Sequence, residues 1–361
     1  MFGFYRTFLA LSVVLSHLLG VPVFGNHAVH GFFILSGYLM THIVTEVYGL
    51  SLAGFGRFAL NRILRLYPLY WVVLGFSVLI VLFYGEDVSR EFRGFIYIPN
   101  NAVEWLQNAS LIYPRSFPWL IYPRLSPPTW ALTVEIFYYV LIGIGVTKSI
   151  RFTLGCLTLS VAFVVWTYTN GLDYDYRYAH LLAGALPFSL GALLCHFRHM
   201  IPAFVQRFIP VGAGAAAVYC LGLFGINCFL CILAKIYPGF ALYLEIGLYV
   251  NLLINFALIA LLVNGELPCI PKKWDKLIGD FSYPIYLMHW QVGLLCSMLL
   301  FGAPLRGFNF EGLCVFLSAI LVSIALSWLL IRGVDEPIQN LRKKIRPRKD
   351  KWVEKSDERS A

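Results

Sequence analysis

Residues 5–24 read YRTFLALSVVLSHLLGVPVF, and this stretch predicts a helix that crosses a lipid bilayer. Spanning the hydrocarbon core takes about 20 mostly apolar residues. A secretory signal peptide is the other interpretation, but no small-residue cleavage site follows, and Arg6 and His17 lie within the run. We therefore expect the segment to be retained as the first of several membrane helices.

The rest of the chain has the same character. Hydrophobic residues make up 59% of its 361 residues and charged residues 13%, and the mean hydropathy is +0.72. Soluble domains carry about 25% charged residues, so this chain has too little charge to cover a water-facing surface. We expect an all-α polytopic membrane protein, with about ten transmembrane helices in one bundle. The predicted spans are 5–24, 28–48, 66–84, 129–147, 152–169, 179–197, 208–226, 240–263, 281–301 and 312–331.

The positive charges predict the orientation of these helices. Ten of the 28 Lys and Arg lie in the last thirty residues. With ten spans, 21 of the 28 fall on the side of the N-terminus, and positively charged loops stay in the cytoplasm. We expect both termini to be cytoplasmic, with residues 1–335 as the membrane domain and 336–361 as a basic tail facing anionic lipid. The net charge of +9 does not indicate a nucleic-acid partner, because no folded basic domain carries it.

The cysteines and the longest loop add little chemistry. The eight cysteines lie mostly in apolar runs, and the lone Cys228-x-x-Cys231 lacks a second pair, so we expect no metal site and no disulfide framework. The connection 85–128, on the external side, is rich in Pro, Tyr and Trp. A loop of this length is usually structured or functional, and its aromatic residues either anchor the interface or stack on a sugar.

Ionisable side chains inside membrane spans are costly, so each is a functional candidate. Arg6 and His17 are eleven residues apart, which in a helix is three turns and about 16 Å of rise on nearly the same face. Arg6 is expected at the cytoplasmic interface and His17 about midway into the bilayer. A histidine there either bonds a neighbouring helix for structure or accepts the proton of a hydroxyl nucleophile.

Further candidates follow along the chain. Arg62 and Arg65, before Tyr67-Pro68, point the same way if helical, either as ordinary cytoplasmic charge or as a clamp for phosphate groups. Glu135 lies a turn or two into a span and is expected to pair with His17 or an arginine. His289 is a second histidine inside a span, and Asp335-Glu336-Pro337 is expected to end the last helix.

These features occur together in a known order. The set comprises Arg6-x10-His17, Phe32-Phe33-Ile34-Leu35-Ser36-Gly37, Arg62-x-x-Arg65, Trp130 through Glu135 with Phe137-Tyr138, Ser282-Tyr283 through His289, and Glu336-Pro337. Over roughly residues 4 to 340 the chain resembles the acyltransferase 3 family of membrane proteins. Each motif alone is weak, but the ordered set is specific.

The resemblance implies a multi-pass enzyme of the cell membrane, in bacteria the inner membrane. It would move an acyl group, commonly acetyl from acetyl-CoA, to a carbohydrate or glycolipid acceptor such as O-antigen or exopolysaccharide, with no permanently bound cofactor. The family's motif histidine falls on His17, its basic partner on Arg6, and its Arg-x-x-Arg motif on Arg62 and Arg65. One departure is His30-Gly31, where many relatives carry an aspartate, and no fused extracytoplasmic hydrolase-like domain is expected.

The mechanism expected from these residues is direct or relayed acyl transfer. Acetyl-CoA docks its phosphates against Arg62, Arg65 and Arg6, while His17, oriented by Glu135, takes the proton of a sugar hydroxyl. The roles of His27, His30 and His289 stay open. Two other functions fit parts of the pattern, a proton-coupled transporter and a lipid-directed acyltransferase of another membrane family.

Overall fold

The computed structural model describes residues 2–208, 212–264 and 270–345, and all regular structure in these ranges is helical. The α-helices are α1 (Gly3–Leu18), α2 (Phe24–Ile43), α3 (Leu52–Tyr84), α4 (Glu86–Phe92), α5 (Ala102–Ser110), α6 (Trp130–Gly143), α7 (Ile150–Thr169), α8 (Tyr174–Tyr178), α9 (Ala185–Phe197), α10 (Ile201–Phe208), α11 (Ala213–Ile236), α12 (Ala241–Asn264), α13 (Lys272–Phe301), α14 (Phe310–Leu330) and α15 (Glu336–Ile345). Short 3₁₀ or π segments cover Val44–Tyr48, Pro118–Leu120, Pro127–Thr129, Leu181–Gly184, Pro238–Phe240 and Ile331–Asp335. The predicted all-α class is confirmed.

Each of the ten predicted spans contains one long helix of this set. Within the described ranges, seven helical segments are long and apolar enough to cross a bilayer, namely those that contain α2, α3, α7, α11, α12, α13 and α14. The apolar helices α1 and α9 are shorter, and α6 has 14 residues. A polytopic bundle is therefore confirmed, while the number of ten spans stays a prediction.

The first helix is shorter than its predicted span. α1 ends at Leu18 rather than at residue 24, because Gly20 takes a left-handed conformation with φ 69° and Pro22 follows it. The prediction of one helix over 5–24 is therefore wrong. His17 lies in the last turn of α1 and not midway along a span.

The third helix is longer than predicted. α3 begins at Leu52 instead of residue 66, and the Ser51 side chain accepts a hydrogen bond of 3.1 Å from the Gly54 N–H at its start. Arg62 and Arg65 are consequently helical and one turn apart, as the pair requires to point the same way.

The end of the last helix is also corrected. Asp335-Glu336-Pro337 does not stop it, because α14 continues through a π-helical turn at Ile331–Asp335 into α15. Pro337 is the second residue of α15 and directly follows the π-helical turn, whose last hydrogen bond runs from the Glu336 N–H to the Ile331 carbonyl. Residues 346–361 of the predicted tail lie outside the described residues.

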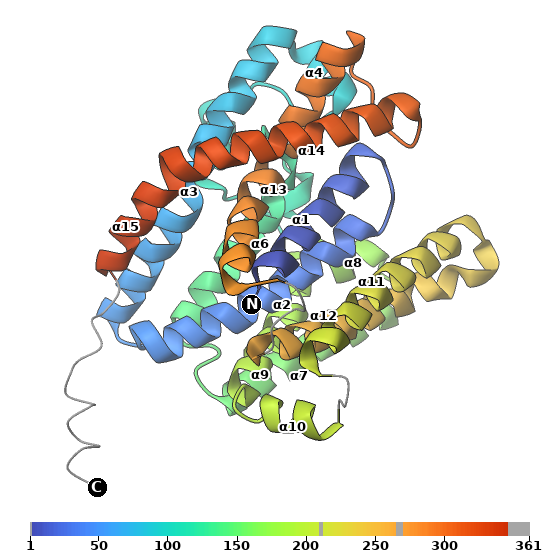
Figure 1. The fold of residues 1–361 in the computed structure, drawn as a ribbon. Helices are drawn as coiled ribbons and strands as arrows, with labels where there is room; N and C mark the ends of the chain where they lie inside the picture. Colours follow the sequence, from blue (N-terminus) through green and yellow to red (C-terminus); the bar gives the residue numbers. More distant parts are fainter. Residues whose placement is uncertain (1, 209–211, 265–269, 346–361) are drawn as a thin grey trace, which may run out of the picture.

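The helices form one bundle around α1 (Figure 1). α1 packs along α13, α2 and α14, and α2 packs in turn on α9 and α12. α11 and α12 form a hairpin at one side, and α15 lies beside α3 at the other (Figure 1). The cluster of buried apolar side chains includes Leu9, Val13, Ile34 and Leu287, so the core surrounds the two helices that carry His17 and His289.

α2 and α9 touch backbone to backbone. A Cβ atom on Gly37 would overlap the carbonyl of Phe188, and one on Gly191 would overlap the carbonyl of Ile34. The two backbones approach this closely because neither helix has a side chain at the contact. This contact holds α2 against α9. From α2, the Ser36 hydroxyl donates a hydrogen bond to Glu135 of the neighbouring α6.

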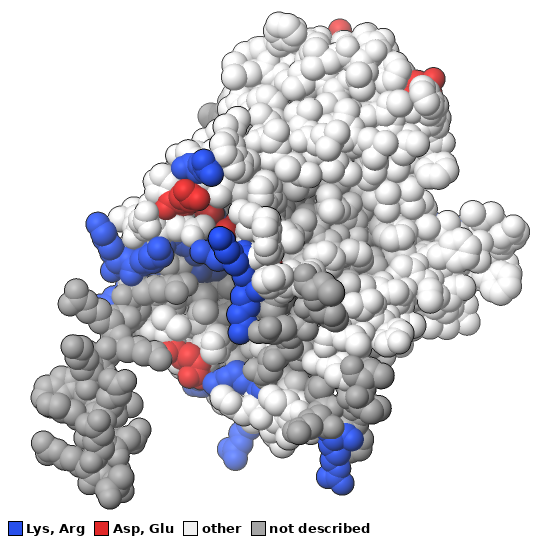
Figure 2. Space-filling view, in the orientation of Figure 1, with Lys and Arg blue, Asp and Glu red and all other residues white. Residues whose placement is uncertain are grey.

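The connection 85–128 is a folded layer and not an open loop. It contains α4 and α5, and the Asn108 side chain donates to the carbonyls of Glu104 (3.0 Å) and Pro123 (2.9 Å). The predicted structured connection is thus confirmed. In the face drawn in Figure 2, Lys and Arg gather toward the end where α15 and the start of α3 lie, and most of the remaining described surface is uncharged.

Candidate active site

A half-buried histidine and a buried one, from distant parts of the chain, are hydrogen-bonded to each other. His17 Nδ1 of α1 lies 2.8 Å from His289 Nε2 of α13, and the two rings stack with centroids 5.1 Å apart. His289 is fully buried. The close packing of α1 along α13 makes this contact, although 272 residues separate the pair in sequence.

The hydrogen bonds determine which nitrogens carry protons when both rings are neutral. His289 Nδ1 lies 2.8 Å from the carbonyl oxygen of Tyr286, which can only accept, so this nitrogen donates. His289 Nε2 is then an acceptor, and His17 Nδ1 must donate to it. His17 Nε2 is left with its lone pair free, and no described residue bonds it.

Four of the five predicted site residues line a second region, the arginine cavity. It has a volume of about 140 Å³, and it is lined by Arg6, Arg62, Arg65 and Glu135 together with Ser36, Tyr139, Tyr283 and Tyr286. Arg6 and Arg62 each have a buried Nε without a hydrogen-bond partner. Donors of this kind suit an acceptor-rich anionic group such as a phosphate.

The arginines of this cavity are held in different ways. Arg62 donates to Asn61 Oδ1 at 2.7 Å and approaches Met40 Sδ at 3.5 Å. Arg65 forms an ion pair of 3.1 Å with Asp335, so part of its charge is already neutralised. Arg62 is therefore the freer of the two for a ligand.

Glu135 does not orient His17. Its carboxylate accepts hydrogen bonds from the Ser36 and Tyr139 hydroxyls, and it faces the arginine cavity while His17 lies at the far end of α1. The predicted His17–Glu135 pair is wrong, because α6 packs its Glu135 face against α2 and α3 rather than against the end of α1. His289 takes the place expected for Glu135.

His17 lines a third region, the histidine cavity, of about 410 Å³. Its walls come from α1, α2, α6, α8, α13 and the connection 85–128. The lining residues are Ser16, His17, Asn26, Arg93, Phe95, Trp119, Leu120, Tyr122, Arg124, Pro127, Trp130, Tyr178 and Trp290. Aromatic walls with hydrogen-bonding edges are suited to a carbohydrate.

Tyr286 connects the wall of the arginine cavity to the histidine pair, since its ring lies 6.5 Å from that of His289. Phe32 and Tyr286 both line the arginine cavity, and their rings pack with centroids 5.8 Å apart. Tyr286 is one turn from His289, and its hydroxyl donates to the Pro128 carbonyl at 2.9 Å.

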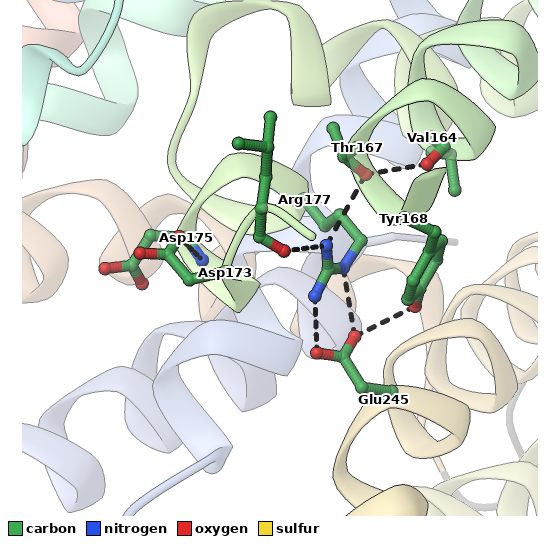
Figure 3. A network of polar contacts seen from close by, with 8 residues as sticks. Val164, Thr167, Tyr168, Asp173, Asp175, Arg177 and Glu245 are labelled. Atoms are coloured by element: carbon green, nitrogen blue, oxygen red, sulfur yellow. Dashed lines mark hydrogen bonds and ion pairs between the residues drawn. The ribbon is translucent and has the colours of Figure 1, made fainter. Parts of the chain in front are cut away.

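Figure 3 shows an ion pair between the buried Arg177 and the half-buried Glu245, in the chain segment next to one wall of the histidine cavity. Arg177 of α8 donates two hydrogen bonds to Glu245 of α12, at 2.6 and 3.0 Å, and Tyr168 of α7 donates to the same carboxylate at 2.9 Å. The next residue, Tyr178, lines the cavity and packs on Trp130. The network thus ties α7, α8 and α12 together behind that wall.

The remaining histidines of interest lie outside both cavities. His27 Nδ1 is 3.4 Å from Cys228 Sγ, and His30 is buried beside Tyr178 with both ring nitrogens unpartnered. Within the described ranges, no group of three or more His, Cys, Asp or Glu side chains could hold a metal ion.

Sequence reasoning missed the partner of His17 and most of the histidine cavity. The signal for the partner was present, since His289 is a polar residue inside an apolar run. The cavity residues Arg93, Arg124 and Trp119 come from the connection 85–128, whose sequence indicates only that its aromatic residues anchor the interface or stack on a sugar.

The chain is similar to known proteins over most of its length. The family model of an acyltransferase domain matches residues 4–332. OatA of Listeria monocytogenes serovar 1/2a, a peptidoglycan O-acetyltransferase, is 24% identical over 300 residues, covering 74% of this chain and 45% of its own length. YrhL of Bacillus subtilis strain 168, named as a candidate peptidoglycan O-acetyltransferase, is 29% identical over 163 residues, covering 40% of this chain and 24% of its own. The chain thus spans less than half the length of these relatives, and no solved structure matches it.

Proposed function

Since the chain belongs to the acyltransferase 3 family and is a membrane acyltransferase, we propose that it transfers acetyl from acetyl-CoA to a hydroxyl of a cell-envelope or exported carbohydrate. The observation that carries the proposal is the free Nε2 of His17, which faces a cavity with aromatic walls while its Nδ1 is held by His289. A neutral imidazole held in one tautomer is a suitable general base for a hydroxyl.

The donor is proposed to bind in the arginine cavity. Arg62 and Arg6 have unpartnered donors there, and Arg65 adds positive charge from the same face of α3. Guanidinium groups of this kind recognise the phosphates of coenzyme A. Glu135, bonded to Ser36 and Tyr139, belongs to this donor region in our proposal.

The reaction is proposed to proceed at His17. Its Nε2 takes the proton of the acceptor hydroxyl as that oxygen attacks the thioester carbonyl carbon. The carbon–sulfur bond then breaks, and the coenzyme A thiolate leaves and takes the proton back from His17. In our proposal the thioester reaches this point past the rings of Phe32 and Tyr286, which line the arginine cavity.

The orientation follows from charge. The arginine cavity lies toward the end of the bundle where Arg62, Arg65 and α15 are found, the end that the positive charges place in the cytoplasm. The histidine cavity then opens outward, in bacteria on the far side of the inner membrane. Acetyl-CoA and the acceptor would enter from opposite sides.

The acceptor is a carbohydrate in this proposal. O-antigen and exopolysaccharide are two candidates, and the names of the two relatives add peptidoglycan as a third. A lipid acceptor is the alternative outcome.

The test is to delete the gene and measure base-labile O-acetyl groups on each surface and exported polysaccharide of the host. Wild-type and His17→Ala forms are restored in parallel, with membrane levels matched. We expect wild type alone to restore acetylation. Unchanged acetyl content in the deletion strain, or full restoration by His17→Ala, would contradict the proposal, and acetate found on lipid would identify the alternative acceptor.

A further inference from the structure

The histidine cavity presents hydrogen-bond donors that have no partner. Three buried side-chain nitrogens among its lining residues are unbonded: Arg93 Nε, Trp119 Nε1 and Trp290 Nε1. Trp290 is only 1% exposed, so water does not readily replace the missing acceptor. No acceptor atom of the described lining residues is buried and unbonded in the same way. An unbonded buried donor costs free energy, so this wall favours a ligand that is rich in acceptors.

The cavity also carries positive charge without a counter-charge. The Arg93 guanidinium makes no hydrogen bond or ion pair with any described residue. The Arg124 guanidinium donates only to backbone carbonyls, those of Pro127 (3.1 Å) and Ile121 (3.1 Å) among them. No Asp or Glu is among the described residues that line the cavity. The charge of the site is therefore net positive.

A third arginine strengthens this field. Arg306 lies against Trp290 at 5.4 Å and donates to the carbonyls of Phe92 (2.9 Å) and His17 (3.4 Å). Arg93 lies 5.1 Å from the same indole ring. Burial and the neighbouring Arg306 lower the pKa of Arg93, as expected for like charges held together without an anion.

The distance from this charge to the reactive nitrogen is short. The Trp290 ring lies 5.2 Å from the His17 ring and 5.1 Å from the Arg93 guanidinium, so the guanidinium is no more than about 10 Å from His17. A ligand that spans this gap can place an anion on Arg93 and a hydroxyl at His17. Trp130 and Tyr178 flank the same space as stacking surfaces.

We propose that the acceptor is an anionic glycan, whose carboxylate or phosphate binds Arg93 while its sugar hydroxyl faces His17. This inference rests on the proposed function, since it names the class of acceptor for the same site. The anion has two chemical sources, a carboxylate on the sugar or the phosphate of a glycolipid carrier. In either case Arg93 selects acceptors by charge before chemistry occurs.

The experiment measures binding without an acetyl donor, so that it does not depend on catalysis. Purified full-length protein in nanodiscs is titrated by calorimetry with N-acetylmuramic acid and with its neutral methyl ester. A second pair is a short-chain polyprenyl phosphate and the matching polyprenol. The variants are Arg93→Gln, Arg93→Lys and Arg115→Gln, the last removing an exposed arginine of the same connection outside the cavity.

We expect wild type and Arg115→Gln to bind one anion at least about tenfold more tightly than its neutral partner, the worth of one charge-assisted contact. The preference should be lost in Arg93→Gln and largely kept in Arg93→Lys. The ligand pair in which the anion binds more tightly than its neutral partner identifies the source of the anion. Equal binding within both pairs, or a preference that survives in Arg93→Gln, would overturn the inference. Acetyl transfer that depends on His17 but shows no anion preference would leave the proposed function standing and remove only this inference.

Discussion

The hydrogen bond between the two histidines predicts that His289 controls catalysis without touching the substrate. Replacing His289 by Leu removes the acceptor for His17 Nδ1. The new side chain is apolar, which suits this fully buried site. His17 can then adopt the other tautomer and turn about its side-chain bonds. A His289→Gln variant offers an amide oxygen as a substitute acceptor.

The expected loss can be bounded from the structure. Full removal of a general base costs about 10² to 10⁴ in rate, so His17→Ala sets the upper limit. A free choice between two tautomers of His17 lowers kcat less than about tenfold, and the loss of ring orientation lowers it further. We therefore expect His289→Leu to lower kcat about 10²-fold, equivalent to about 3 kcal/mol of transition-state stabilisation. His289→Gln should recover most of this.

The assay is steady-state transfer from acetyl-CoA by protein in nanodiscs, with kcat and KM determined separately. KM for acetyl-CoA should stay unchanged, because the arginine cavity is lined by other residues. Nitrogen-15 NMR of labelled histidine should show that the single His17 tautomer of wild type is lost in His289→Leu. The reasoning is refuted if His289→Leu keeps kcat within about twofold of wild type, or if only KM changes.

Three further predictions concern the donor site and the frame. Arg62→Gln should raise KM for acetyl-CoA about tenfold with little change in kcat, whereas the exposed Arg57→Gln on the same helix should match wild type in the same assay. Gly191→Ala should destabilise the protein by about 2 kcal/mol, seen as a lower melting temperature in detergent, because its Cβ meets the α2 backbone. Glu245→Gln should lower the free energy of unfolding by about 3 kcal/mol, because the buried Arg177 loses its counter-charge. A melting temperature equal to that of wild type would show that this ion pair does not stabilise the fold.

The sequence was sufficient to locate the helices because lipid leaves a spanning backbone few alternatives to a helix. Each apolar run contains one, and the errors lie at the ends. α1 stops early at the left-handed Gly20, whereas α3 extends through Arg62 and Arg65, which composition alone assigns to a loop. Helices that leave the membrane do not change their backbone at its surface, so hydropathy cannot mark where they end.

The site was only partly predictable, for a different reason. Arg6 and the Arg62–Arg65 pair do meet in one cavity, since all lie near the same end of their helices. Which polar side chains face each other within the bundle depends on how the helices pack, and this is why Glu135 was assigned to His17 in place of His289. Nothing in the spacing of residues 272 positions apart encodes such a contact.

The early end of α1 has a consequence for how a sugar is handled. Its 16 residues rise about 24 Å, less than the roughly 30 Å thickness of the hydrocarbon region. His17 sits at the end of this short helix and faces an open cavity. A polar acceptor would therefore keep much of its hydration until it reaches the base, and the free energy of stripping water from several hydroxyls would not have to be overcome. The protein would extend the aqueous phase inward to the reaction instead of drawing the carbohydrate into the membrane.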